Sequence, residues 1–330
     1  MTAPGSIGAA VDVGSTSVHL LVASLDGADL TVLADQSEFL GLGPIVDADG
    51  RLGAPTRDLL RDTLASYVDV ARGLGARHVA IVATEPLRRA GDAARAGFDI
   101  ARATGMPVHV LTHEEEAFLT LIGATAARPI TVETLIVDIG GGSSEFCDVP
   151  AAGTAHASGV RLGAGRLTDR YVAHDPPTRD ELTAMAHAAE LALERAPVAA
   201  PQELVLVGGT ASNLLKVAPT TMDDRVIDAA RLAQAIDTML SRPSDALVDQ
   251  FLVRARRARI LPAGAMIVEA IMRRYGLASA TVADGGIREG AVRIALHAGP
   301  AWRDRLLALA HGWDTSTPEI AETAVTGTTT

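Results

Sequence analysis

The chain has 330 residues, a net charge of −11 and 48% hydrophobic residues, which suits two domains of ordinary size. Its single cysteine, Cys147, excludes a disulfide framework and a zinc site built on cysteines. The acidic balance and the 3% of aromatic residues disfavour nucleic-acid binding, because phosphate backbones are repelled and stacking platforms are scarce. No apolar run approaches the ~20 residues of a membrane span, and no signal-peptide pattern opens the chain. We therefore expect a cytoplasmic protein that does not bind membranes.

The first pattern along the chain is a short apolar run that ends in an acid. Asp12 closes the run at residues 9–11, and a second probable strand follows at residues 18–22. The turn between them is rich in glycine and hydroxyl groups: Gly14, Ser15, Thr16 and Ser17. A single turn of this kind is most often only a tight connection between strands.

The rest of the first third of the chain alternates between strand and helix patterns. Strands are expected at residues 30–34, 78–83 and 108–111, and helices at residues 57–74 and from about residue 92. This alternation predicts one α/β domain at residues 1–124.

The next helix begins after Thr112 and carries three glutamates in a row. Thr112 and Glu115 match a capping box, so the first two acids have a structural explanation. Glu116 instead shares a helical face with Leu119 and Gly123, a stripe of apolar and small residues. A carboxylate on such a face can meet a desolvated cleft, and the pattern leaves both a structural and a chemical role open.

The most informative stretch is residues 134–146, TLIVDIGGGSSEF. Its apolar run does not alternate, which predicts a strand buried on both faces, and Asp138 ends that strand. The residues that follow bring backbone N–H groups and hydroxyls close to a bulky anion: Gly140, Gly141, Gly142, Ser143 and Ser144. Glu145 adds a second carboxylate within reach of a metal. Because the turn after Asp12 repeats this order, the two copies predict a phosphate-binding pair.

Two more strands deliver glycine turns in the second half of the chain. A strand at residues 203–207 leads to Gly208, Gly209 and Thr210 at the start of a helix, a place suited to an anion. Another strand at residues 280–283 leads to Asp284, and a helix follows from Ile287. We expect a second domain at residues 125–300 and an extension at residues 301–330 whose Thr/Ala-rich end, residues 315–330, is typical of disorder.

Four arginines lie close together before a helical segment: Arg254, Arg256, Arg257 and Arg259. Such a cluster is most often a solvated helix face. The alternative is that it supplies the positive surface that a polyanion needs on an acidic protein.

Together, these turns resemble the nucleotide and phosphate loops of the actin, sugar kinase, Hsp70 and acetate kinase superfamily. The finer match is to the Ppx/GppA family of exopolyphosphatases and guanosine pentaphosphate phosphohydrolases. The motifs that carry it run in the family's order: residues 82–88, residues 114–117, DIGGGSSE, residues 162–163, residues 261–264 and residues 286–290. The resemblance implies an α/β fold with two ribonuclease-H-like domains, as in actin-like ATPases, that face a central cleft, often in a homodimer.

The resemblance also implies the chemistry, which is hydrolysis of a terminal phosphoanhydride with Mg²⁺ or Mn²⁺. Glu116 would be the general base that deprotonates the attacking water. Asp12, Asp138 and Glu145 would hold the metal. The glycine turns at residues 14–17 and 140–144 would hold phosphates, and Arg88 would pair with one of them.

Several positions depart from the family's pattern. Thr16 stands where Asn is common, His113 where Gly is usual, and Glu85 where a small hydroxyl residue or alanine is common. Glu38 and Phe39 occupy a place where an Arg-Leu-Gly run is typical. These changes add negative charge to the first domain's groove and remove an arginine, while the hydrolytic residues are intact. We therefore expect short polyphosphates or a small phosphorylated molecule to be preferred over long chains.

Three functions from different classes fit these patterns. The leading one is a phosphohydrolase, with polyphosphate as first substrate and guanosine pentaphosphate as second. A small-molecule kinase of the same superfamily is disfavoured because the Glu116 segment belongs to the hydrolase pattern. A non-catalytic phosphate or nucleotide sensor is the third, motivated by Glu85 and the missing arginine.

Overall fold

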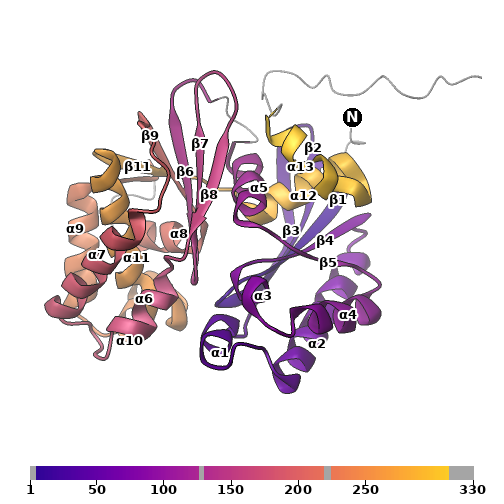
Figure 1. The fold of residues 1–330 in the computed structure, drawn as a ribbon, viewed down its shortest axis with the longest axis horizontal. Coiled ribbons are helices and arrows are strands. Elements are labelled where there is room, and N and C mark those ends of the chain that lie inside the picture. Colours follow the sequence, from indigo (N-terminus) through magenta and orange to yellow (C-terminus); the bar gives the residue numbers. More distant parts are fainter. Residues whose placement is uncertain (1–4, 126–129, 219–223, 312–330) are drawn as a thin grey trace, which may run out of the picture.

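The computed structural model describes residues 5–125, 130–218 and 224–311. The described residues form one sheet of five strands and one of six, each flanked by helices (Figure 1). The α/β class predicted from the sequence is therefore confirmed. The segment at residues 315–330 lies outside the described residues. Within the described part of the chain, no helix has the length and apolar character needed to cross a membrane.

The first sheet has the strand order β3-β2-β1-β4-β5. The first three strands are antiparallel, and β4 and β5 run parallel to β1. Their bounds are β1 (Ser6–Val13), β2 (Ser17–Asp26), β3 (Asp29–Phe39), β4 (His78–Ala83) and β5 (Val108–Val110). Four helices belong to this part: α1 (Leu42–Asp49), α2 (Ala54–Gly73), α3 (Glu85–Arg89) and α4 (Ala93–Thr104). The edge strand β3 is longer than predicted because most of its residues are exposed and lack an apolar pattern.

The second sheet has the order β10-β11-β9-β6-β7-β8. An antiparallel meander, β6-β7-β8, is followed by β9 and β11 in parallel, so the topology of the first sheet is repeated with β10 added at the edge. The bounds are β6 (Thr134–Ile139), β7 (Ser144–Val149), β8 (His156–Val160), β9 (Glu203–Val207), β10 (Val226–Asp228) and β11 (Ser279–Val282). This repetition places Asp12 and Asp138 at equivalent ends of two central strands.

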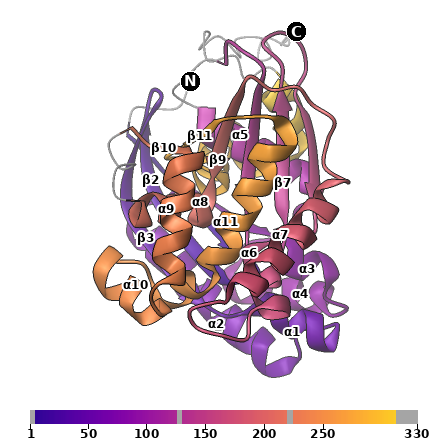
Figure 2. The same ribbon diagram turned by 90° about the vertical axis from the view of Figure 1, so that its left-hand side faces the viewer.

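Six helices cover the second sheet. They are α6 (Ala164–Tyr171), α7 (Arg179–Leu193), α8 (Gly208–Val217), α9 (Ala229–Leu240), α10 (Ser244–Phe251) and α11 (Ala255–Tyr275). Figure 2 shows α7 and α9 on either side of the long helix α11, against which both pack. α8 begins at Gly208, three residues before the predicted start, whereas β4 and β9 have the predicted bounds.

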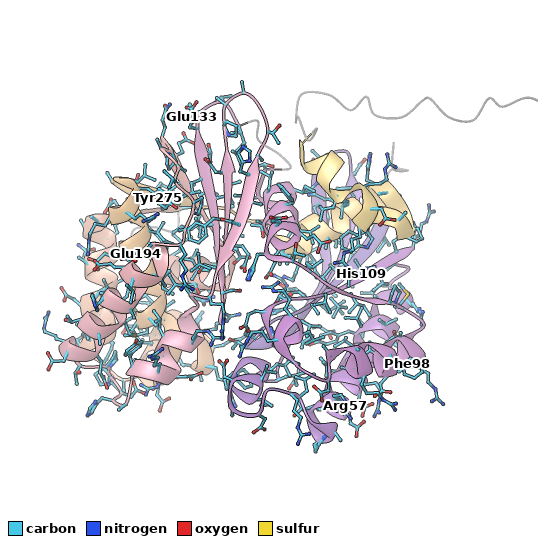
Figure 3. The ribbon with its side chains drawn as sticks, in the orientation of Figure 1. Arg57, Phe98, His109, Glu133, Glu194 and Tyr275 are labelled. Carbon is cyan, nitrogen blue, oxygen red and sulfur yellow. The ribbon has the colours of Figure 1, made fainter. Side chains whose placement is uncertain are left out.

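Three further helices of the described residues are α5 (His113–Thr125), α12 (Ile287–Ala298) and α13 (Trp302–His311). α5 packs against strands of the second sheet, and also against α12, which lies on β1, β2 and β4. The ring of His109 in β5, which is labelled in Figure 3, lies edge-on to that of Trp302 in α13, with ring centroids 5.0 Å apart. The predicted domain boundaries stay a prediction, and this packing leads us to propose that residues 287–311 belong with the first domain.

The capping box predicted at the start of α5 is present. The Thr112 N–H donates to Glu115 Oε2 at 2.7 Å, and the Glu115 N–H donates to Thr112 Oγ1 at 3.1 Å. Arg303 of α13 donates to both carboxylate oxygens of Glu115 and to the Val110 carbonyl. α13 thus connects the end of β5 to the first turn of α5, which carries Glu116.

α5 and α12 cross in direct backbone contact. A Cβ atom built on Gly290 would lie 1.9 Å from the Leu119 carbonyl oxygen, and one on Gly123 would lie 1.9 Å from the Gly286 carbonyl oxygen. Only glycine fits at such a crossing, because backbone atoms cannot move aside as side chains do. The crossing sets where the first turn of α5 stands relative to the turn before α12.

Replacing Gly290 by alanine should therefore lower the free energy of unfolding by about 3 kcal/mol or more. Gly97→Ala in α4 is the matched control, because a Cβ there meets no atom within 4 Å. It should instead stabilise the protein by up to about 1 kcal/mol through helix propensity. Urea unfolding of both variants measures the difference, and equal effects would show that the crossing is not tight.

Candidate functional site

A cavity of about 410 Å³ lies between the two sheets and is lined by turns from both. The sequence-predicted residues that line it are Asp12, Gly14, Ser15, Thr16, Ser17, Glu116, Asp138, Gly140, Gly141, Gly142, Ser143, Glu145, Gly208 and Gly209. The turn at residues 284–286 and the first residues of α12 also line it. Residues from at least five separate parts of the chain therefore meet at one place.

The two hairpin turns of the cavity have matching bases. The Gly14 N–H donates to the Ser17 carbonyl at 3.1 Å, and the Gly140 N–H donates to the Ser143 carbonyl at 3.0 Å. Their tips touch across the gap between the sheets, since a Cβ on Gly141 would lie 2.2 Å from Thr16 Oγ1. The glycines of the second turn are thus required for the two turns to face each other.

Four of the acidic side chains that line the cavity come from the central strands and from α5. Asp12 and Asp138 are the penultimate residues of β1 and β6. Asp138 stands opposite Glu145 in the β6–β7 ladder, and Glu116 lies in the first turn of α5. Burial raises the pKa of Asp12 to about 7, of Asp138 to about 6 and of Glu145 to about 8. Burial and then the Glu145 charge raise the pKa of Glu116 well above its usual range.

Arg88 lies beside two of these acids. Its Nη1 donates to Glu116 Oε2 at 2.5 Å and to the Leu111 carbonyl at 2.8 Å. Its Nη2 lies 3.7 Å from Glu145 Oε1. Arg88 is not among the residues that line the cavity, so its predicted contact with phosphate stays a prediction.

The four clustered arginines lie at the N-cap and in the first turns of α11, and both alternatives that the sequence left open occur among them. Arg257 lines the cavity and lies against Gly209, where a Cβ would be 2.9 Å from its guanidinium carbon. Arg254 and Arg256 are exposed, and the Arg256 guanidinium lies 3.3 Å from the centroid of the Phe39 ring. One member of the cluster thus supplies positive charge to the cavity.

Two predicted phosphate ligands have structural partners for their hydroxyls. The Ser144 hydroxyl donates to the Leu162 carbonyl at 2.5 Å, and the Thr210 hydroxyl donates to the Ile139 carbonyl at 2.9 Å. Neither residue lines the cavity. Their hydroxyls fix the neighbouring backbone, and their role toward phosphate stays a prediction.

Several residues that line the cavity were not predicted as site residues from the sequence, among them His19 and Arg288. His19 stands opposite Asp12 in the β1–β2 ladder, and burial lowers its pKa to about 3. Arg288, in the first turn of α12, lines the cavity and pairs with Asp35 at 2.7 Å. The hairpin predicted around residues 14–17 was the sequence signal that could have placed His19 opposite Asp12. No local pattern indicated the direction of the Arg288 side chain.

Glu85 belongs to a group of ion pairs that joins the two halves. Its carboxylate is buried and accepts from Arg89 at 2.6 Å, from Arg166 at 2.8 Å and from the Ser15 hydroxyl at 3.2 Å. Arg166, on α6, also pairs with Asp47 of α1 at 2.8 Å. The negative charge that the sequence predicted at residue 85 is therefore neutralised by arginines from both domains. We call these residues the interdomain cluster: Asp47, Glu85, Arg89 and Arg166.

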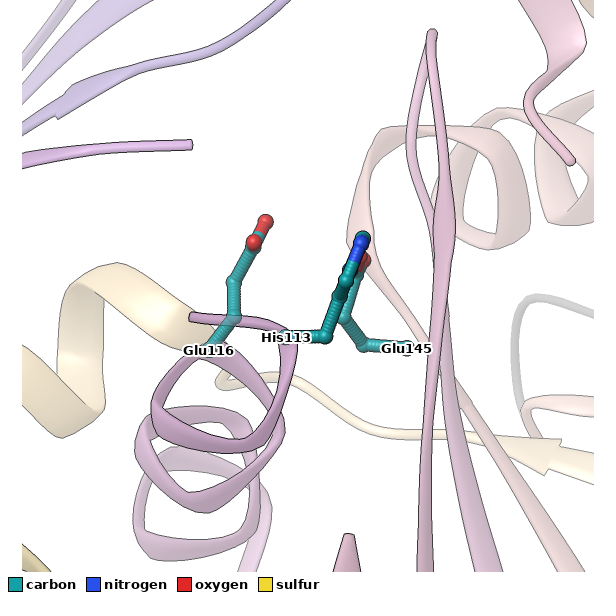
Figure 4. A group of neighbouring side chains, drawn as sticks. All are labelled: His113, Glu116 and Glu145. Atoms are coloured by element: carbon teal, nitrogen blue, oxygen red, sulfur yellow. The ribbon is translucent and has the colours of Figure 1, made fainter. Parts of the chain in front are cut away.

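The donors of the cavity fit a divalent cation. Asp12 Oδ1 is buried and has no hydrogen-bond partner among the described residues. Carboxylate oxygens are the ligands that Mg²⁺ and Mn²⁺ prefer, and Asp138 and Glu145 line the same wall. In the described parts of the chain, the ligand atoms of His113, Glu116 and Glu145 all lie within 4.8 Å of one another (Figure 4).

Comparison with known proteins agrees with this geometry. The model of the Ppx/GppA phosphatase family matches residues 21–298. Exopolyphosphatase 1 of Mycobacterium tuberculosis is 28% identical over 300 residues, which cover 86% of each chain. The Mycobacterium leprae protein of the same name is 27% identical over 300 residues, covering 86% of this chain and 87% of that protein.

Solved structures extend the similarity to the fold. The Aquifex aeolicus member of the Ppx/GppA family superposes with a TM-score of 0.76 at 26% identity, covering 89% of this chain and 99% of that one. An exopolyphosphatase from Cytophaga hutchinsonii superposes with a TM-score of 0.78 at 20% identity, covering 88% and 98%. The predicted arrangement of two ribonuclease-H-like domains around a cleft is thereby confirmed.

The raised pKa values predict how the metal-free protein responds to pH. Unfolded carboxyls titrate near the ordinary values of 3.8 and 4.5, whereas Asp12 and Glu145 titrate at about 7 and about 8 in the folded protein. From about pH 4 to 8 the folded chain keeps protons that the unfolded chain has lost, so stability should fall as the pH rises. Denaturation in EDTA at pH 6.5 and pH 8 measures this, because below pH 6.5 the lowered pKa of buried His19 changes stability in the opposite direction. A divalent cation should restore stability at pH 8.

Asp12→Asn should flatten this pH dependence because it removes one of the titrating groups. Asp249→Asn, at an exposed position of α10, is the matched control and should leave the slope unchanged. Stability that rises across the same pH range in EDTA would contradict the assignment of these buried acids.

Proposed function

The chain belongs to the Ppx/GppA phosphatase family and is a phosphoanhydride hydrolase, and from that premise we propose that its cavity releases the terminal phosphate of inorganic polyphosphate. The observation that carries the proposal is the meeting of two glycine turns, one from each sheet, over buried carboxylates that include Glu116. Phosphoryl transfer needs charge neutralisation and an aligned nucleophile, and this combination of groups supplies both.

The turns and arginines bind the phosphates. Backbone N–H groups at the tips of residues 14–17 and 140–143 donate to phosphate oxygens, and Arg257 adds positive charge from the opposite wall. Asp12, Asp138 and Glu145 would hold Mg²⁺ or Mn²⁺, which when bound supplies charge neutralisation to the phosphoanhydride.

Glu116 acts as the general base on the attacking water. Without substrate, Arg88 holds its carboxylate at 2.5 Å. An incoming phosphate competes for the Arg88 guanidinium, and Glu116 is then able to accept a proton. The water oxygen bonds to the terminal phosphorus, its proton passes to Glu116, and the phosphoanhydride bond breaks with the electron pair leaving on the shortened chain.

The interdomain cluster supports a preference for short chains. Asp47 and Glu85 neutralise Arg89 and Arg166 beside the turn tips, and the Arg166 Nε also donates to the Gly142 carbonyl at 3.1 Å. A long polyphosphate that runs past the turns would meet cations that are already paired. It would also have to part the contact between Ser15-Thr16 and the second turn.

A second candidate substrate is guanosine pentaphosphate. A neighbouring cavity of about 390 Å³ shares Ser15, Thr16, Gly141 and Gly142 with the first. Its wall includes Phe39, Val172 and Ile260, so it offers an apolar surface for a nucleoside ring. Comparing hydrolysis of tripolyphosphate with that of guanosine pentaphosphate decides between the two substrates.

Glu116→Gln should lower the rate of phosphate release by roughly 10²- to 10⁴-fold, because the amide cannot accept the proton of water. The amide keeps the shape of the side chain, so the fold and substrate binding should survive. Glu114→Gln, exposed on the same helix, is the control and should keep full activity. Near-normal turnover in the Glu116→Gln variant would exclude Glu116 as the base. Separately, release of phosphate by the wild-type protein without any acceptor would exclude a kinase and a non-catalytic sensor.

Asp47→Asn should improve the hydrolysis of long polyphosphate relative to short polyphosphate. Removing this carboxylate leaves Arg89 and Arg166 paired with Glu85 alone, so their two charges are no longer fully neutralised. The KM for long chains should fall roughly two- to fivefold at low salt and by less at high salt. Asp49→Asn, exposed on the same helix, is the control. Steady-state kinetics on short and long chains at two salt concentrations tests this, and a wild-type protein that favours long chains would contradict it.

A further inference from the structure

The contacts of the His113 Nδ1 atom do not form a consistent pair of hydrogen bonds. Nδ1 lies 3.0 Å from Arg88 Nη2 and 2.8 Å from Glu145 Oε1. Arginine only donates, so the first contact needs a lone pair on Nδ1, whereas an ionised carboxylate only accepts, so the second needs a hydrogen there. One imidazole nitrogen has a lone pair or a hydrogen, never both. A cation between Nδ1 and Oε1 would bind both atoms through their lone pairs, so no hydrogen would be needed between them.

His113 Nδ1 and Glu145 Oε1 have the spacing of two neighbouring ligands around one ion. A Glu116 oxygen lies within 4.8 Å of both residues' ligand atoms, and Glu116 is left as the base. Two neighbouring ligands of an octahedral ion with bonds of roughly 2.0–2.1 Å lie roughly 2.8–3.0 Å apart. The 2.8 Å separation of Nδ1 and Glu145 Oε1 matches this value.

The protein makes room for the imidazole at this place. Gly159 of β8 stands opposite Glu145 in the β7–β8 ladder, and a Cβ built on it would lie 2.4 Å from His113 Nδ1. Any other residue at position 159 would push the ring away from the carboxylate. Figure 4 shows the ring at the start of α5, beside Glu145.

We propose that His113 is a ligand of the divalent cation together with Glu145. The ion would take the one lone pair of Nδ1, so the contact of this nitrogen with Arg88 Nη2 has to be given up when the ion binds. A nitrogen ligand favours a first-row transition ion over Mg²⁺, so the site binds Mn²⁺ in preference to Mg²⁺. The proposal rests on the proposed function only in assuming that the cavity binds a divalent cation. Binding of that cation can be measured without turnover.

Pulsed electron paramagnetic resonance of the protein with bound Mn²⁺ tests this directly. We expect a ¹⁴N coupling from a directly bound imidazole in the wild-type protein, and its loss in His113→Gln. His156→Gln, at an exposed position of β8, should keep the coupling. Titration of each protein with Mn²⁺ and Mg²⁺ should show that His113→Gln loses Mn²⁺ affinity roughly tenfold or more, while Mg²⁺ affinity changes less.

Two results overturn the proposal. Bound Mn²⁺ without a ¹⁴N coupling in the wild-type protein means that His113 does not bind the ion and that its contact with Glu145 is a hydrogen bond. A coupling that survives in His113→Gln and disappears in His19→Gln assigns the ligand to His19, the histidine that lines the cavity. A nitrogen-ligated ion in a protein that releases no phosphate supports His113 as a ligand and refutes the proposed function, so the two failures are distinguishable.

Discussion

Carboxylates that are buried together in one cavity impose the main constraint on this molecule. Asp12, Asp138, Glu116 and Glu145 converge there from two sheets and one helix. Ionised carboxylates in a desolvated space repel one another, so the protein must hold protons on them or bring in positive charge. The raised pKa values of these acids and the contacts of Glu116 and Glu145 with Arg88 both reflect this need for protons or positive charge. Such an arrangement opposes stability, and it is typical of a site that has to bind a cation and a polyanion.

The fold produces this convergence by repeating one topology. Each sheet places a central strand, an acid and a hairpin turn at the same edge, so Asp12 and Asp138 face the same cavity. Backbone contacts then fix the separations, at the crossing of Gly123 with the start of α12 and at the meeting of Gly141 with Thr16. The interdomain cluster holds the two halves together beside the turn tips. Chemistry that needs fixed positions is thus supported by contacts that only glycine allows.

Local signals were sufficient to predict much of this. The unbroken apolar run before Asp138, the glycine turns and the capping box at Thr112 each depend on residues close in sequence, and the structure contains all of them. The pairing of Glu85 with Arg166 was not predictable, because Arg166 lies 81 residues away and reaches it from the other domain. The same holds for the contact between His113 and Glu145, which depends on how α5 approaches β7. The return of α12 to the first sheet also depends on tertiary packing and has no local pattern.

The need for positive charge in the cavity can be measured as the number of protons that leave the protein when a cation binds. If Asp12 and Glu145 keep protons near neutral pH, binding of a divalent cation must displace them, because metals bind the ionised carboxylate. Isothermal titration with Mn²⁺ at pH 7, in two buffers of different ionisation enthalpy, gives the number of protons released per bound ion. The account predicts a clear net release that diminishes in Asp12→Asn. Tight binding of the ion in the cavity without proton release would contradict it.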